Sequence, residues 1–169
     1  MSLLESHNLL ETRDRLISEI SLLSYDEFNR SPERNKWSVA QICHHLILAE
    51  KLFTKAIVLG LRNIDNKTEH KNINLVLDRT KKLEAPEMVK PTSEPIEVQQ
   101  IIDMLNDSRN KLLAVLSTVK DKSLLAEKSA KHPVFGELSL DQWIELLYLH
   151  EQRHIEQIKE IKLLIGIGN

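Results

Sequence analysis

Two histidines and a glutamate lie close together in the last long segment with helical periodicity, which we expect to be a helix over 139–165. His150 and His154 are four residues apart, so on an α-helix they lie only about 40° apart around the axis. Both imidazoles and the Glu151 carboxylate fall inside the apolar stripe of this segment, not opposite it. Burying such groups without partners is costly. The segment therefore predicts either a metal ion bound by both imidazoles or two core histidines satisfied by ordinary hydrogen bonds.

A second pair of histidines, His44 and His45, lies shortly after Trp37. Ser38 followed three residues later by Gln41 is a capping-box pattern, which predicts that a helix begins here. We expect this helix to end near Gly60, which would serve as its C-cap. The apolar stripe turns His45 toward the core and His44 toward solvent. His45 could then meet His150 and His154 inside a helical bundle.

Two further apolar-periodic segments complete the elements that must position these histidines. One covers 3–23, and the other runs from about Pro95 to Val119. Within the latter, we expect the polar run 107–111 to be a solvated face. We find no internal sequence repeat. Four long amphipathic helices predict an all-α protein, a four-helix bundle that forms a single domain over 1–169.

The remaining segments are expected to be connections. Residues 61–95 form a long connection between the second and third helices, with a short helix over 72–83 and an irregular stretch that contains three prolines. A connection of this length is often a lid or a pocket wall, and it equally suits a plain crossover between helices. Residues 120–135 are expected to be a loop. Ser139 and Gln142 repeat the capping-box pattern before the last helix.

Composition restricts the classes of function. The 169 residues carry a net charge of -2, which gives no electrostatic support for nucleic-acid binding. Apolar runs are too short to span a bilayer, and the start of the chain lacks the basic region of a secretory signal. The one cysteine, Cys43, forms no internal disulfide and is compatible with a reducing cytoplasm, where we expect the protein to act. We expect Cys43 to be a packing residue rather than a nucleophile.

Three imidazoles with an open fourth position would resemble a catalytic metal site more than a structural one. Imidazole binds zinc, nickel, iron and copper, so the ligand type does not select the metal. A divalent ion lowers the pKa of bound water, polarises a carbonyl or stabilises a thiolate. Glu151 could then act as a general base, or it could orient a histidine ligand.

Two other metal-binding signatures overlap this segment. Residues 150–154 match H-E-x-x-H of zinc proteases, yet Gln157 and Glu160 stand where the long form of that motif has Gly and His. A glutamate ligand well downstream is not expected, because only 15 residues follow His154. A protease would also be expected to have strands that align a peptide, and we expect none. Residues 151–154 match E-x-x-H of di-iron bundles, but the second E-x-x-H which such a site requires is absent. Neither signature accounts for the chain.

The combined pattern resembles the DinB/YfiT-like superfamily. The stretch from Trp37 to His45 is similar to the second-helix motif of that family, and the stretch from Phe135 through His154 is similar to its last-helix motif. The resemblance covers essentially the whole chain. It implies a four-helix bundle with a long connection, and a divalent metal ion held by His45, His150 and His154.

For activity, the resemblance implies a metal-dependent hydrolase or a thiol S-transferase that uses a low-molecular-weight thiol as cosubstrate. The metal would be zinc, nickel or iron, the substrate a small molecule, and the assembly a homodimer. We expect no nucleic acid or membrane as a partner. The alternative is a non-catalytic, stress-associated bundle protein whose histidines are structural or relict.

Overall fold

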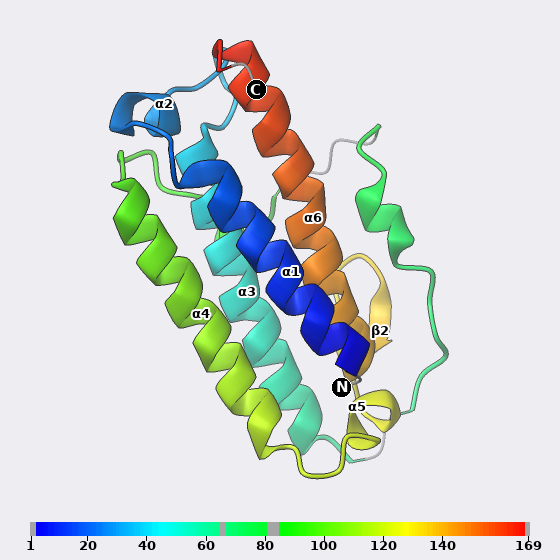
Figure 1. Cartoon of the computed structure of the whole chain (residues 1–169). Helices are drawn as coiled ribbons and strands as arrows, with labels where there is room; N and C mark the ends of the chain where they lie inside the picture. Colours follow the sequence, from blue (N-terminus) through cyan, green and yellow to red (C-terminus); the bar gives the residue numbers. More distant parts are fainter. Residues whose placement is uncertain (1–2, 65–66, 81–84, 168–169) are drawn as a thin grey trace.

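A computed structural model describes residues 3–64, 67–80 and 85–167 of the chain. Four long helices dominate it: α1 (Leu3–Ile20), α3 (Val39–Arg62), α4 (Val98–Thr118) and α6 (Leu140–Leu164). The shorter elements are α2 (Tyr25–Asn29), the 3₁₀ helices η1 (Asn74–Leu77) and η2 (Glu87–Val89), α5 (Leu124–Glu127), and the strands β1 (Ser129–His132) and β2 (Gly136–Ser139). The four-helix bundle with a long connection between its second and third long helices is confirmed (Figure 1).

The direction of the helices explains the length of that connection. Helices α3 and α4 run in the same direction, whereas α1 and α6 run in the opposite one (Figure 1). The chain must therefore return along the bundle between α3 and α4. Helix α3 packs against α4 and α6, and α1 packs against α6. The helices α3 and α6, which pack against each other, are thus each supported by one further long helix, α4 for α3 and α1 for α6.

Helix starts follow the predicted side-chain caps in one case and not in the other. Ser38 accepts a hydrogen bond from the Gln41 amide, and the Gln41 side chain accepts one from the Ser38 amide, so the expected capping box is present. Ser139 makes no side-chain cap. The Gln142 side chain instead hydrogen-bonds the main chain of Lys71 in the long connection. The second box was wrong because Gln142 has a partner outside its own helix.

The region expected to be a loop before the last helix contains an antiparallel hairpin. Strands β1 and β2 pair from Ser129 with Ser139 to His132 with Gly136. Gly60, expected to be a C-cap, packs against this hairpin, while α3 continues to Arg62. A Cβ at position 60 would lie 2.5 Å from Leu140 Cδ2 and 3.0 Å from the Ser129 carbonyl oxygen. Gly60 is therefore required for close packing of the helix against the strand.

Other expected connections also carry local structure. The short helix expected over 72–83 is the 3₁₀ turn η1, and positions 81–83 lie outside the described residues. The connection between α1 and α3 contains the single-turn helix α2. No helix in the described part of the chain is both long and apolar enough to cross a membrane.

The apolar core has two parts. One cluster surrounds Phe53 and Trp143 near the hairpin, and the other surrounds Ile42 and Ile155 toward the opposite end. Charged and imidazole side chains occupy the level between them on each long helix. This polar layer contains the candidate site.

Candidate metal centre

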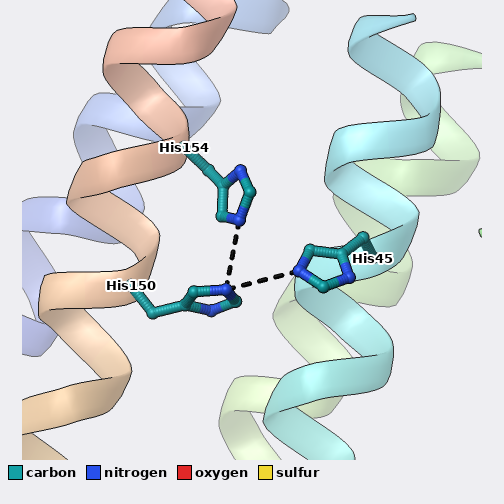
Figure 2. Close-up of side chains that lie close together, drawn as sticks. All are labelled: His45, His150 and His154. Atoms are coloured by element: carbon teal, nitrogen blue, oxygen red, sulfur yellow. Dashed lines mark hydrogen bonds between the residues drawn. The ribbon is translucent and has the colours of Figure 1, made fainter. Parts of the chain in front are cut away.

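His45, His150 and His154 meet between α3 and α6, as the sequence predicts (Figure 2). The Nε2 atom of His150 lies 3.3 Å from Nε2 of His45 and 3.1 Å from Nε2 of His154. One ligand atom from each ring lies within 4.8 Å of the others. Nitrogens bound at about 2.05 Å to a tetrahedral ion are roughly 3.3 Å apart. The distances from Nε2 of His150 to Nε2 of His45 and of His154 therefore suit binding to a common ion.

The outward nitrogens of two rings fix the protonation of the inward ones. His45 Nδ1 donates a hydrogen bond to the Val89 carbonyl oxygen at 2.8 Å, because a carbonyl can only accept. His154 Nδ1 donates to Gln157 Oε1 at 2.8 Å. In these neutral tautomers, both Nε2 atoms present lone pairs toward His150. Two lone pairs cannot form a hydrogen bond with each other. A cation between the rings would give both of them a partner.

The third ring has no such outer partner. Among the described residues, Nδ1 of His150 is the one buried side-chain nitrogen or oxygen without a hydrogen bond. If Nε2 of His150 donated to its neighbours, Nδ1 would be a buried unpaired acceptor. If Nε2 instead carried a lone pair, Nδ1–H would be a buried donor without a partner, and three lone pairs would converge. The donor set fits a divalent ion better than a closed network of hydrogen bonds.

Burial keeps all three rings neutral and therefore available as ligands. Loss of solvation, and after it the nearby His45, lowers the pKa of His154 to about 3. Burial and then the neighbouring His154 and His45 hold the pKa of His150 well below its ordinary value. The pKa of His45 is also lowered by burial. Protons would therefore compete only weakly for these nitrogens near neutral pH.

The long connection forms part of the wall beside the histidines. In addition to the Val89 contact with His45, the Thr92 amide donates to Nδ1 of His44 at 3.0 Å. His44 is therefore half-buried against the connection, not turned freely to solvent as expected. On the other side, Arg153 donates to the carbonyl oxygens of Val76 and Asp78. The connection is thus fastened to both helices that carry the candidate ligands.

Glu151 has a different environment from the one expected. Its carboxylate accepts hydrogen bonds from Thr12 at 2.6 Å, from Arg13 Nε at 2.8 Å and from Arg109 at 3.1 Å. These partners belong to α1 and α4, and both arginines also pair with Glu50 of α3. The expected contact with a histidine ring is replaced by a buried ion pair, and this geometry does not support a general base at Glu151.

Sequence reasoning missed this network of buried charges. Arg109 belongs to the polar run expected to be solvated, but it is buried, as is Ser108. A signal was present, because apolar residues flank Arg109 at helical spacing on the same face, namely Leu105, Leu112 and Leu116. Glu50, also buried, pairs with Arg13 and Arg109.

Cys43 and His132 are buried near the site without belonging to the cluster. Burial raises the pKa of the Cys43 thiol, so this residue is a poor nucleophile, as expected. His132 lies against Phe53 and Trp143, and burial lowers its pKa to about 4. Its Nδ1 accepts from the amides of the two residues that follow the proline, which fixes the ring in the hairpin turn.

Comparisons with known proteins agree with this geometry. Residues 8–158 match the family model described as the DinB superfamily. The uncharacterised protein YuaE of Bacillus subtilis (strain 168) is 31% identical over 153 residues, which cover 90% of this chain and 93% of YuaE.

Two solved structures share the fold at low sequence identity. YfiT from Bacillus subtilis, described as a probable metal-dependent hydrolase with an unusual four-helix bundle topology, superposes with a TM-score of 0.65 at 18% identity. That match covers 96% of this chain and 86% of YfiT. TT2238, described as a four-helix bundle protein, gives a TM-score of 0.63 at 13% identity, over 92% of this chain and 96% of its own.

Proposed function

Because the chain belongs to the DinB superfamily, and because three imidazole nitrogens converge in its core, we propose that it is a divalent-metal-dependent enzyme acting on a small molecule. The ligands are His45, His150 and His154, and the metal is zinc, nickel or iron. The observation that carries the proposal is the pair of inward lone pairs, fixed by Val89 and Gln157, that face the third ring.

A bound divalent ion would supply either a water of lowered pKa for hydrolysis or a stabilised thiolate for S-transfer. The chain's own residues prepare the site for that ion. The Val89 carbonyl and the Gln157 amide hold two rings in the ligand tautomer. Trp37 lies against His45, with ring centroids 5.2 Å apart.

A pocket of about 150 Å³ lies beside the site and would hold the body of the substrate. Two of its lining residues, Trp37 and Gln157, contact the candidate ligands His45 and His154. The rim carries charge of both signs, including Lys36, Glu33 and the Arg79–Glu160 ion pair. This lining suits a small polar molecule better than an extended apolar one.

Metal titration of the purified, metal-stripped protein tests the proposal. We expect one divalent ion per chain, and we expect His45→Ala to weaken binding at least about a hundredfold, because a direct ligand should matter no less than the groups that orient it. His44→Ala is the matched control, since His44 is the adjacent residue and bonds the connection instead of facing the cluster. Equal weakening by both variants, or binding unchanged by His45→Ala, would refute the site.

The two reactions are separated by their need for a thiol. One assay would follow hydrolysis of ester, amide and phosphoester substrates without thiol. The other would follow conjugation of an electrophile with bacillithiol, mycothiol or glutathione. Turnover in either assay that disappears on chelation and returns with metal would identify the reaction class. The absence of metal-dependent turnover from both would favour a non-catalytic bundle.

A further inference from the structure

The buried arginines make a pair of reciprocal contacts between α1 and α4. Arg13, on α1, donates to the carbonyl oxygen of Leu105 on α4, and Arg109, on α4, donates to that of Leu9 on α1. Each accepting leucine precedes the other arginine by four residues on its own helix. Exchanging α1 with α4 therefore leaves this pattern unchanged.

The two glutamates follow the same exchange. Arg13 uses Nε for Glu151, at 2.8 Å, and its terminal nitrogen for Glu50, at 2.8 Å. Arg109 uses Nε for Glu50, at 2.5 Å, and its terminal nitrogen for Glu151, at 3.1 Å. Each carboxylate also accepts a hydroxyl hydrogen bond of 2.6 Å, Glu151 from Thr12 and Glu50 from Ser108. We call Arg13, Glu50, Arg109 and Glu151 the charge quartet.

The sequence contains the corresponding repeat, which corrects the expectation that none exists. Leu9, Thr12, Arg13 and Leu16 recur at the same spacing as Leu105, Ser108, Arg109 and Leu112. Ser38, Gln41, Leu46, Glu50 and Ile57 recur as Ser139, Gln142, Leu147, Glu151 and Ile158. The opposite directions of α1 and α4, and of α3 and α6, are those that a two-fold axis across the bundle requires (Figure 1).

The candidate metal ligands are where the two halves differ. When the two halves are aligned on their quartet glutamates, Ala49 and Phe53 correspond to His150 and His154. Leu146 then corresponds to His45. All three counterparts are buried apolar residues. The charge quartet is thus common to both halves, whereas the imidazoles occur on one side of it only.

We propose that Glu151, held in place by the charge quartet, is a positioning residue for the metal centre, an inference that rests on the proposed function. Glu151 directly follows His150, and three groups from α1 and α4 hold its carboxylate. Helix α6 cannot rotate about its axis without breaking these bonds, so His150 and His154 stay turned toward α3. Glu50 makes equivalent ion pairs from α3, but it is not adjacent to a candidate ligand. Buried ion pairs often add little net stability, while removal of one partner is strongly destabilising.

The internal repeat supplies a matched pair of variants, Glu151→Gln and Glu50→Gln. Both remove one charge and keep the shape of equivalent side chains. We expect similar losses of stability from the two. Glu151→Gln should weaken metal binding about tenfold or more, as loss of an orienting group does. Glu50→Gln, five residues from the nearest candidate ligand, should weaken it less than about threefold by the same reasoning.

A spectrum and a metal-free measurement separate positioning from general stabilisation. The absorption spectrum of bound Co²⁺ should change in Glu151→Gln and stay as in the wild type in Glu50→Gln. In the metal-free protein, nuclear Overhauser contacts of the His45 ring with the rings of His150 and His154, whose centroids lie 5.2 Å and 5.0 Å from it, should be present in the wild type and in Glu50→Gln and weakened in Glu151→Gln. This second readout decides the inference even if the wild type binds no metal, in which case only the proposed function fails.

An apolar replacement of the whole charge quartet tests the inference if the single variants fail to fold. Arg13→Met, Arg109→Met, Glu50→Leu and Glu151→Leu together remove every charge, a change that buried ion pairs often tolerate. Cooperative unfolding would show that this variant is folded, and we expect weakened contacts between the His45 ring and the rings of His150 and His154. Wild-type ring contacts and wild-type metal affinity in a folded apolar variant would overturn the inference, as would indistinguishable effects of Glu50→Gln and Glu151→Gln.

Discussion

Acid should destabilise the metal-free protein well above the pH at which carboxylates titrate. The fold holds the pKa of His154 at about 3, because the ring is buried and close to His45. In the unfolded chain this pKa is about 6.5. Between these values the unfolded chain binds a proton that the folded protein does not, so stability falls as pH falls from about 6.5 toward 3. Above pH 6.5 this histidine contributes no pH dependence.

The magnitude follows from the interval crossed. Each pH unit below 6.5 costs about 1.36 kcal/mol per histidine. Lowering the pH from 8 to 5 should therefore remove roughly 2 kcal/mol through His154 alone. His45 and His150, whose pKa values are also lowered by burial, add to the loss in the same direction. This sum is a large part of the stability of an ordinary domain.

Urea denaturation in EDTA at pH 8 and pH 5 measures this loss. His154→Phe introduces the residue type that the repeat has at the equivalent position, Phe53. In this variant the difference in the free energy of unfolding between the two pH values should shrink by roughly 2 kcal/mol. His7→Asn is the control, because His7 is exposed on α1 and lies outside the histidine cluster, so the difference should persist in this variant. A free energy of unfolding that is equal at both pH values in the wild type would contradict the buried neutral histidines. A loss of unfolding free energy between pH 8 and pH 5 that is as large in His154→Phe as in the wild type would contradict them as well.

Three further predictions concern packing, capping and reactivity. Gly60→Ala should lower the free energy of unfolding by about 1–3 kcal/mol through overpacking, since the new methyl would meet Leu140. Leu59→Ala, at a half-exposed neighbouring position, should lower it less. Equal losses in urea denaturation would contradict the close approach at Gly60. Ser38→Ala should cost about 1 kcal/mol through the lost N-cap, measured by thermal unfolding, and an unchanged midpoint would exclude that cap. Cys43 should react with a thiol reagent only as fast as the protein opens, because it is fully buried; labelling at the rate of a free thiol would show that it is accessible.

The helices and the histidine cluster were predictable because both depend on local spacing. Periodic apolar residues mark each long helix, and the stripe tells His45 from the adjacent His44 without any knowledge of the partner helix. Two histidines one turn apart on a core-facing stripe must point into the interior. Their convergence with His45 needed only the assumption of a bundle, which the structure confirms.

The charge quartet and the hairpin were not predictable on the same basis. Glu151 falls inside the wide apolar stripe of α6, so its wheel position could not decide between a histidine of α3 and the arginines of α1 and α4. The polar neighbours of Arg109 suggested a solvated face, although the apolar residues around it shared its side of the helix. Strands of four residues are too short to show alternation. In each case the deciding partner lies on a distant segment.

The most direct test of the account is X-ray diffraction at the absorption edge of a divalent metal, from crystals grown with that metal. A common site for His45, His150 and His154 predicts one anomalous peak about 2.0–2.1 Å from each Nε2 atom. A fully occupied peak elsewhere on the chain, with the three rings still in mutual contact and no ion between them, would contradict it.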